Sequence, residues 1–549
     1  MEGPRGVVSA VEAGPEEVRL TGAGLTIEQV VAVARSGARV AELDAGTTAR
    51  LEASRSWVDE AVRGGEVIYG VNTGFGSLAN RRIRASEARQ LSRNVILKCV
   101  TGVGDPLPAD WVRAMLVVRA NSLAKGYSGV RPAVVENLVA MLNRGVTPWV
   151  PSKGSLGASG DLAPLAHIAT VLTRGVEETE DRYSGRAWYE GELLSGEEAM
   201  RRAGIPRLVP EAKEGLALTN GTAQMVAAGA LGVHDAEDLL WHAELAAALS
   251  MEALLALSDS LDAAVHEVNH QPGQCRVAEE LHSLLHGSRL IDSDAEKMQD
   301  AYSLRCTPQV LGPVADVLTF LRQRFEGALN AAADNPLIFL DGGEGEEGEH
   351  EGREGARGRG PRAVSGGNFH GEGPAMWLDF LGVAVAEIAS LAERRIFRLL
   401  TPELNGGLPA MLAPSEGLNS GLMAAQYTAA ALVSENKTLA HPDCVDSIPT
   451  SAGQEDHVSM GANAARHAWE ILANVRTVVA IELLTAAQAI WLRPRGPECL
   501  GRGTGAAYRA IRERVEPVER DRELSPEIQA VEELMWSGAL RNAVEGRRA

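Results

Sequence analysis

The sequence predicts an all-α protein, with a long central helix bundle preceded by a loop-rich N-terminal domain. Aromatic residues make up only 4% of the 549 residues while apolar residues make up 45%, so the core must be mostly Ala, Leu and Val. Ala and Leu are strong helix formers. Long apolar runs of helical character recur through the chain, whereas the apolar–polar alternation of strands is scarce. Together these observations favour packed helices.

The chain divides into four predicted segments. These are a flexible leader (residues 1–22), an N-terminal domain (23–215), the central bundle (216–495) and a C-terminal helical segment (496–549). Thr26 begins a capping pattern, T-I-E-Q, ahead of the first apolar-periodic run. Residues 64–80 are rich in Gly and Asn and are predicted to form a loop. Residues 342–363 are of low complexity and are predicted to be a disordered insertion in the bundle.

The helices of the bundle follow from long runs with little charge. Helical patterns cover residues 111–142, 217–257, 376–400, 418–440 and 461–492, and the second of these is interrupted by glycine near its start. Two stretches, residues 215–234 and 417–434, carry no charge but contain Gly and polar residues. We predict that both are helices buried inside the bundle and not membrane spans.

Charge and cysteine content exclude several classes of protein. The formal net charge of -20 disfavours a nucleic-acid partner, which needs clustered Lys and Arg. The five cysteines are scattered and form no C-x-x-C pair, so neither a disulfide framework nor a metal site is predicted. Residues 1–18 lack the apolar core of a signal peptide. We therefore expect a cytoplasmic protein without a membrane partner.

The motif GSLGASGDLAPLAH contains the tripeptide that carries the predicted chemistry. Gly160 has no Cβ, so in a tight bend its amide nitrogen can approach the carbonyl carbon of Ala158. Cyclisation with loss of two waters would give a 4-methylidene-imidazol-5-one ring, in which Ser159 becomes an electrophilic methylidene. Asp161 follows directly and is placed to assist the proton transfers. A helix predicted to start just after it would polarise the ring. No external cofactor is required.

Seven sequence blocks, in order, resemble the aromatic amino acid lyase family, which comprises the histidine, phenylalanine and tyrosine ammonia-lyases and related aminomutases. The blocks are YGVNTGFG (69–76), GSLGASGDLAPLAH (154–167), EGLALTNGT (214–222), QDAYSLRCTPQ (299–309), DNPLIF (334–339), GGNFHGE (366–372) and QEDHVSM (454–460). The resemblance extends from about residue 18 to residue 535. It implies that the ring forms autocatalytically and that the chain eliminates ammonia from a small aromatic amino acid. It also implies a homotetramer in which each active site is assembled from three chains.

The resemblance implies catalytic roles for four residues: Ser159, Tyr69, Asn220 and Tyr302. The methylidene derived from Ser159 would take up the substrate amine. Tyr69 would remove the β-proton, with the surrounding loop closing as a lid over the site. Asn220 would donate to the imidazolone oxygen, as a donor in an oxyanion hole does.

Three further residues are implied to contact the substrate, and Tyr302 lies close to one of them in the sequence. Arg305 would hold the substrate carboxylate in a bidentate pair. Tyr302, one helical turn before it, resembles a second active-site phenol. Gln299 and Phe369 match substrate-contacting positions in the family.

The identity of the substrate ring rests on two opposed signals. The QED block resembles histidine lyases, whereas phenylalanine and tyrosine enzymes usually have N-Q-D, and the Glu455 carboxylate can accept the imidazole N–H. However, Lys98 and Cys99 occupy two ring-pocket positions at which histidine lyases usually have Ser-His, tyrosine lyases His-Leu and phenylalanine lyases Phe-Leu. Lys98 could bind an unprotonated imidazole nitrogen, or it could serve an acidic or modified ring.

L-Histidine, converted to trans-urocanate, is the leading prediction. A phenylalanine or tyrosine ammonia-lyase, or a 2,3-aminomutase, is the alternative within the family. A structural or binding paralogue that never forms the ring is the alternative from another class, and an intact mass would separate it from the enzymes.

Overall fold

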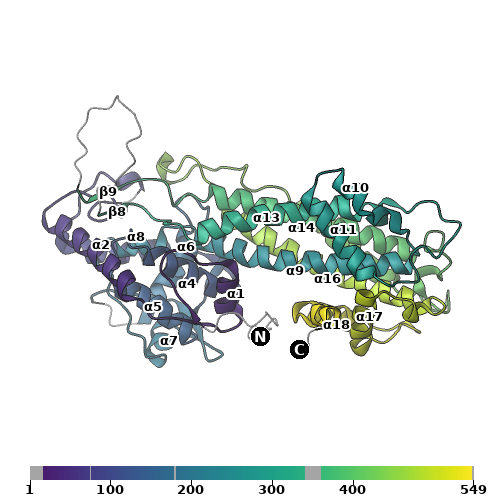
Figure 1. Ribbon diagram of the computed structural model, residues 1–549. Helices are drawn as coiled ribbons and strands as arrows, with labels where there is room; N and C mark the ends of the chain where they lie inside the picture. Colours follow the sequence, from purple (N-terminus) through teal and green to yellow (C-terminus); the bar gives the residue numbers. More distant parts are fainter. Residues whose placement is uncertain (1–16, 75, 178–180, 341–359, 547–549) are drawn as a thin grey trace.

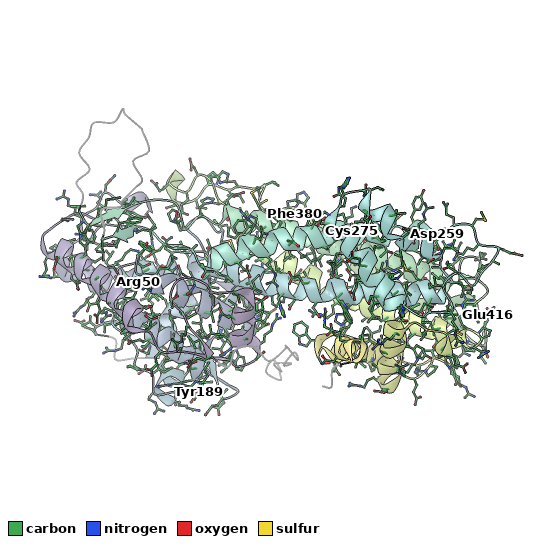
Figure 2. The ribbon with its side chains drawn as sticks, in the orientation of Figure 1. Arg50, Tyr189, Asp259, Cys275, Phe380 and Glu416 are labelled. Carbon is green, nitrogen blue, oxygen red and sulfur yellow. The ribbon has the colours of Figure 1, made fainter. Side chains whose placement is uncertain are left out.

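The computed structural model describes residues 17–74, 76–177, 181–340 and 360–546. It confirms the all-α prediction, because helices dominate and the described strands form only two- and three-stranded sheets. The molecule is elongated, with an N-terminal region at one end and a helix bundle extending away from it (Figure 1). Figure 2 labels Arg50 and Tyr189 in the N-terminal region and Glu416 at the far end of the bundle.

The described residues of the N-terminal region form eight α-helices. They are α1 (Ile27–Arg35), α2 (Ala45–Arg63), α3 (Ala88–Lys98), α4 (Ala109–Ala124), α5 (Pro132–Asn143), α6 (Leu162–Leu172), α7 (Gly196–Arg202) and α8 (Glu214–Thr219). The predicted capping box is confirmed: the Thr26 side chain accepts from the backbone of Gln29, and the Gln29 side chain accepts from the backbone of Thr26. The run predicted at 111–142 is two helices. Gly126, at φ +85°, turns the chain after α4, and Pro132 starts α5.

Short strands tie the segments of this region together. They are β1 (Glu17–Val18), β2 (Arg39–Val40), β3 (Val103–Pro106), β4 (Thr147–Pro148), β5 (Pro151–Lys153), β6 (Arg186–Tyr189), β7 (Glu192–Ser195), β8 (Leu337–Phe339) and β9 (Arg362–Val364). The end of the predicted leader belongs to the fold, because β1 pairs in parallel with β2 and Val18 is buried. The predicted insertion falls between β8 and β9. Its last two residues belong to β9, and residues 342–359 lie outside the described part of the chain.

Four long helices form the bundle. They are α9 (Ala223–Ala253), α13 (Thr307–Leu329), α14 (Glu372–Leu400) and α16 (Gly461–Leu492). Around them lie α10 (Ala263–Glu267), α11 (Pro272–Leu285), α12 (Tyr302–Arg305), α15 (Met423–Leu439), α17 (Arg502–Arg514), α18 (Ser525–Trp536) and α19 (Ala539–Glu545). Single 3₁₀ turns complete the described chain: η1 (Gly76–Leu78), η2 (Ala85–Glu87), η3 (Asp181–Tyr183), η4 (Ser258–Leu261), η5 (Ala410–Leu412), η6 (Ser451–Gly453) and η7 (Gly496–Glu498).

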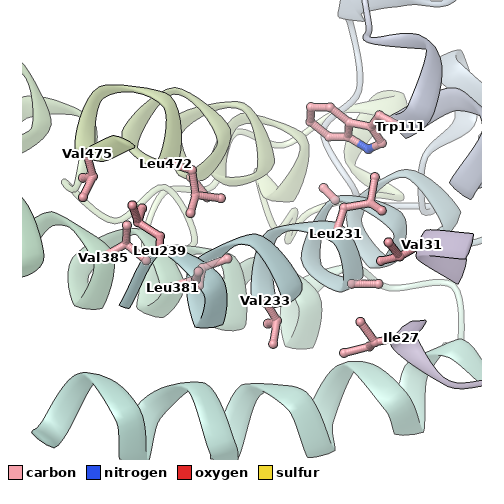
Figure 3. Close-up of a cluster of buried hydrophobic side chains, with 14 of the residues drawn as sticks. Ile27, Val31, Trp111, Leu231, Val233, Leu239, Leu381, Val385, Leu472 and Val475 are labelled. Atoms are coloured by element: carbon pink, nitrogen blue, oxygen red, sulfur yellow. The ribbon is translucent and has the colours of Figure 1, made fainter. Parts of the chain in front are cut away.

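The core of the bundle lies where α9, α14 and α16 meet. Figure 3 shows buried side chains from these helices: Leu231, Leu239, Leu381, Val385, Leu472 and Val475. α14 and α16 are long and apolar enough to cross a membrane, but 56% and 78% of their most apolar windows are buried inside the molecule. Such burial is typical of core helices in a bundle.

One of the two charge-free stretches is not buried within the chain. Residues 215–234 form α8 and the start of α9 and are buried almost throughout, as predicted. The prediction for residues 417–434 is wrong. α15 follows a turn that contains glycines at positive φ and packs against α14 and α16 along one face only, so that Tyr427 is 62% exposed. Only Ala425, Ala429 and Asn436 of α15 are buried.

Candidate active site

The tripeptide Ala158-Ser159-Gly160 forms a tight turn between β5 and α6. Gly157 and Gly160 face each other across an antiparallel bridge, at φ +72° and +74°. These are left-handed conformations that favour glycine. The turn ends at Asp161, the residue that precedes the first turn of α6. The predicted helix after the motif is therefore confirmed.

The turn packs directly against Gly221. A Cβ placed on Gly160 would lie 2.3 Å from the Gly221 carbonyl oxygen, and the Asp161 amide donates to the same oxygen at 2.7 Å. Gly221 belongs to the break between α8 and α9, so the helix predicted over residues 217–257 is interrupted at the point where it meets the turn. The contact holds the turn in a bend with no room for a side chain on Gly160.

Two side chains bind Ser159 from different segments. The Asn220 amide Nδ2 donates to the Ser159 carbonyl oxygen at 2.7 Å. The Ser159 hydroxyl donates to Glu455 Oε1 at 2.8 Å, and Thr450 Oγ1 donates to Glu455 Oε2 at 2.9 Å. The structure thus brings Asn220, Ser159 and Glu455 together although Glu455 lies 296 positions along the chain from Ser159.

Asp161 is completely buried beside the turn. Its Oδ2 accepts from the Gln224 and Met225 amides, at 2.8 and 3.1 Å, in the first turn of α9. No residue in the described ranges hydrogen-bonds to Oδ1. Burial raises the pKa of Asp161 to about 7, although the two backbone hydrogen bonds and nearby Arg119 favour the charged form. A buried carboxyl group that titrates near neutrality can hold or release a proton next to the turn.

Tyr69 lies in a loop that reaches the segment around Glu455. Its hydroxyl accepts from the Gly76 amide at 3.4 Å, and a Cβ on Gly76 would lie 2.7 Å from Ser451 Oγ. The loop prediction for residues 64–80 holds for the described residues after α2, which form turns and the single 3₁₀ turn η1. Tyr69, the candidate base, therefore lies on an irregular segment that packs against the segment containing Ser451 and Glu455.

Cys99 and Lys98 end α3 near Glu455. Cys99 is buried and Lys98 is exposed. Burial raises the pKa of the Cys99 thiol, Lys98 lowers it, and the negative charge of Glu455 raises it further. Phe369 is half-buried in the block before α14, where the Gly371 amide donates to the Gly157 carbonyl oxygen at 2.9 Å. All three candidate residues thus lie on segments that border the turn or Glu455.

Three predicted substrate contacts lie at the other end of the bundle. The start of α14 bonds Gly157 beside the turn, whereas Arg395 near its end donates to the Ser303 carbonyl oxygen of α12 at 3.5 Å. Arg395 follows Gly371 by 24 positions, which span about 36 Å at the helical rise of about 1.5 Å per residue. Gln299, Tyr302 and Arg305 therefore do not meet Ser159 within one chain. Gln299 and Tyr302 are exposed, and the Arg305 guanidinium lies 5.7 Å from the centre of the Tyr302 ring.

Two features of the site were missed by reasoning from sequence. Thr450 orients the Glu455 carboxylate, and Arg119 supports the backbone at Asn220. Arg119 did carry a signal: it is flanked on each side by five uncharged residues in an apolar helix. A lone charge in such a run predicts a buried polar network. Among the described residues, no group of His, Cys, Asp and Glu could hold a metal ion.

Comparisons with known proteins agree with this geometry. A family model described as aromatic amino acid lyase matches residues 25–513. The histidine ammonia-lyase of Caldanaerobacter subterraneus subsp. tengcongensis is 47% identical over 531 residues, covering 96% of this chain and 98% of the relative.

Two solved structures share the fold over nearly the whole chain. The tyrosine aminomutase of Streptomyces globisporus has a TM-score of 0.87 at 34% identity and covers 97% of this chain and 99% of its own. The histidine ammonia-lyase of Trypanosoma cruzi has a TM-score of 0.84 at 38% identity, with 96% and 95% covered. The chain therefore belongs to the aromatic amino acid lyase family and is a carbon–nitrogen lyase.

Proposed function

We propose that this enzyme eliminates ammonia from L-histidine to give trans-urocanate. The observation that carries the proposal is the position of Glu455, whose carboxylate lies 2.8 Å from the Ser159 hydroxyl. A carboxylate at this place can accept the N–H of a substrate imidazole and hold its tautomer. The near full-length similarity to histidine ammonia-lyases supports the same substrate.

We also propose that the turn is the place where 4-methylidene-imidazol-5-one forms. The residues fit the group: Gly160 has no room for a side chain against Gly221, and Asn220 donates to the Ser159 carbonyl oxygen, which becomes the ring oxygen. Once formed, the group would supply an electrophilic carbon for the substrate amine. No external cofactor is needed.

The chain's own residues would orient the substrate and move its proton. The Tyr69 hydroxyl takes the β-proton, and the loop that carries it excludes water from the site. Asn220 stabilises negative charge on the Ser159 oxygen through its amide hydrogen bond. Arg305 holds the substrate carboxylate through two parallel hydrogen bonds, next to the Tyr302 phenol. Gln299, Phe369, Lys98 and Cys99 line the remainder of the substrate pocket.

The active site is proposed to be shared between chains of a homotetramer. The distance of about 36 Å along α14 leaves a single chain without its carboxylate-binding arginine at Ser159. Exposed apolar side chains on α14 and α15 also favour burial against other copies. These include Met376 at 55%, Phe380 at 43% and Tyr427 at 62% exposure; Phe380 is labelled in Figure 2. We expect the assembly in the cytoplasm.

A second substrate class is favoured by Lys98 and Cys99. These two side chains lie on the Glu455 side of the site, where imidazole recognition would benefit from a histidine. A phenylalanine or tyrosine ammonia-lyase, or a 2,3-aminomutase, is therefore the alternative.

The purified enzyme should be incubated with L-histidine while the ultraviolet absorbance of urocanate is followed, with Ser159→Ala as the matched control. We expect absorbance to rise only with the unsubstituted enzyme. A rise with phenylalanine or tyrosine and none with histidine would favour the alternative. Chromatography for β-amino acids separates a lyase from an aminomutase.

A further inference from the structure

Arg119, in the middle of α4, is a buried cation that the proposed chemistry does not use. It is 2% exposed, and none of the described carboxylates forms an ion pair with it. Its Nε atom has no hydrogen-bond partner among the described residues, and burial lowers the pKa of the guanidinium. Burying a charge without a direct counter-ion is costly, and here the cost is offset by hydrogen bonds and by the nearby carboxylates of Asp334 and Asp161.

The guanidinium donates to three backbone oxygens, two at the C-terminal end of α8 and one in the segment before β8. Nη2 donates to the carbonyl oxygens of Ala217 and Asn220, the latter at 2.9 Å, and Nη1 donates to Ala333 at 2.9 Å. The first two carbonyls lie at the C-terminal end of α8, where a cation is favoured by the helix dipole. Arg119 is thus bonded to the backbone of the residue whose side chain donates to Ser159.

Arg119 also lies directly behind the turn. A Cβ on Gly221 would lie 2.4 Å from Arg119 Nη1, and on the other side a Cβ on Gly160 would lie 2.3 Å from the Gly221 oxygen. The turn, Gly221 and the guanidinium are therefore stacked in contact without space for one methyl group in either interface.

A buried ion pair keeps the third acceptor in place. Lys213 Nζ lies 2.7 Å from Asp334 Oδ2, both side chains are at most 1% exposed, and Lys213 also donates to the Asn335 carbonyl oxygen at 3.3 Å. Asp334 directly follows Ala333, so the pair anchors the carbonyl that Arg119 binds. The guanidinium is consequently a fixed support.

We propose that Arg119 is a positioning residue that presses Gly221 and Asn220 against the turn during ring closure. The inference rests on the proposed function. Closure forms the bond between Gly160 N and the carbonyl carbon of Ala158, and two waters leave without any oxidant. The first water takes its oxygen from the Ala158 carbonyl and its two hydrogens from the Gly160 and Ser159 amides. The second consists of the Ser159 hydroxyl group and the hydrogen on the Ser159 Cα.

Arg119→Lys tests the proposal, because a single ammonium cannot make the same fork of hydrogen bonds. Arg493→Lys is the matched control. Arg493 is also buried, and it also donates to three carbonyl oxygens, of Ala253, Gly406 and Asn405, at the opposite end of the bundle. Intact mass of each purified protein gives the fraction of chains that have lost two waters, and thermal midpoints compare stability.

We expect full water loss in the unsubstituted protein and in Arg493→Lys, and a dehydrated fraction reduced by more than half in Arg119→Lys. In addition, kcat per dehydrated chain should fall in Arg119→Lys while KM changes little, since Asn220 loses its support. Full water loss with an unchanged kcat in Arg119→Lys would overturn the proposal. Absence of water loss in the unsubstituted protein would overturn the proposed function itself.

Gly221→Ala keeps the guanidinium but inserts one methyl group between it and the turn. Gly221→Ala therefore tests the proposal if Arg119→Lys does not yield folded protein. A reduced dehydrated fraction in folded Gly221→Ala supports the stacked arrangement, and complete dehydration contradicts it.

Discussion

The stability of the Asp161→Asn protein, measured relative to the aspartate form, should be greater at neutral pH than at acidic pH. The comparison is best made in a Ser159→Ala background, in which neither protein can form the ring. Asn keeps an oxygen for the amides of Gln224 and Met225, which now bond Asp161 Oδ2. Its NH₂ group replaces Oδ1, which has no partner among the described residues. The substitution therefore mimics the protonated carboxyl group.

The magnitude follows from the shift in pKa. Burial raises the pKa of Asp161 from 3.8 to about 7. Between these values the unfolded chain loses its proton while the folded chain keeps it, so stability falls as pH rises. Each pH unit contributes about 1.4 kcal/mol, which gives about 4 kcal/mol over the whole interval. Below pH 3.8 and above pH 7 the difference between the two proteins should be constant.

Denaturant unfolding of both proteins at equal concentration, from pH 4 to pH 8, measures this difference. Asp44→Asn is the control that should give a nearly constant difference. Asp44 caps α2 from the surface, and its hydrogen bond from the Thr47 amide lowers its pKa below the ordinary value, so its stabilising effect is lost only at a pH below the range measured. A difference between the Asp161 and Asn proteins that does not change with pH would refute the reasoning.

Three further predictions concern the substrate, the assembly and the core. Glu455→Gln should lower kcat/KM for histidine roughly ten- to hundredfold, since a hydrogen bond to a charged group contributes about 1.5–3 kcal/mol. An unchanged kcat/KM in steady-state kinetics would show that Glu455 does not bind the substrate. Arg305→Ala and Ser159→Ala should each be inactive alone, yet co-expression should restore part of the activity in mixed oligomers; inactive mixed oligomers would argue against shared sites. Lys213→Met should cost about 3–5 kcal/mol in denaturant unfolding because it leaves Asp334 buried and unpaired; Lys213→Met combined with Asp334→Leu should cost less, and an additive loss would show that the ion pair is not the cause.

Much of the fold could be predicted because its helices carry strong local signals. The limits of α16 match the prediction of residues 461–492, since a glycine starts the apolar run and Arg493 directly precedes a proline. Glycine near the start of the 217–257 run predicted an interruption there, but the sequence did not show its place at Asn220 or its cause. The residues on both sides form helices, and the interruption is stabilised by contacts with the turn and with Arg119, which are distant in sequence.

The candidate site was only partly predictable for a related reason. The motif around Ser159 and the Asn220 block indicated the chemistry, and the structure places them in contact. By contrast, nothing in the spacing of residues 299–305 reveals that they lie at the far end of the bundle. The exposed face of α15 was mispredicted because a charge-free helix can be buried against its own chain or against another, and periodicity does not distinguish these.

The length of α14 sets a distance within the chain. The turn around Ser159 is hydrogen-bonded to the start of α14 and α12 is hydrogen-bonded near its end, so the number of residues between these two bonds fixes the distance between the two groups of candidate site residues. One residue inserted in the middle of α14 would displace its far end by about 1.5 Å and rotate it by about 100°. A change of length within α14 would therefore alter both the distance and the relative orientation of the segments bound at its two ends.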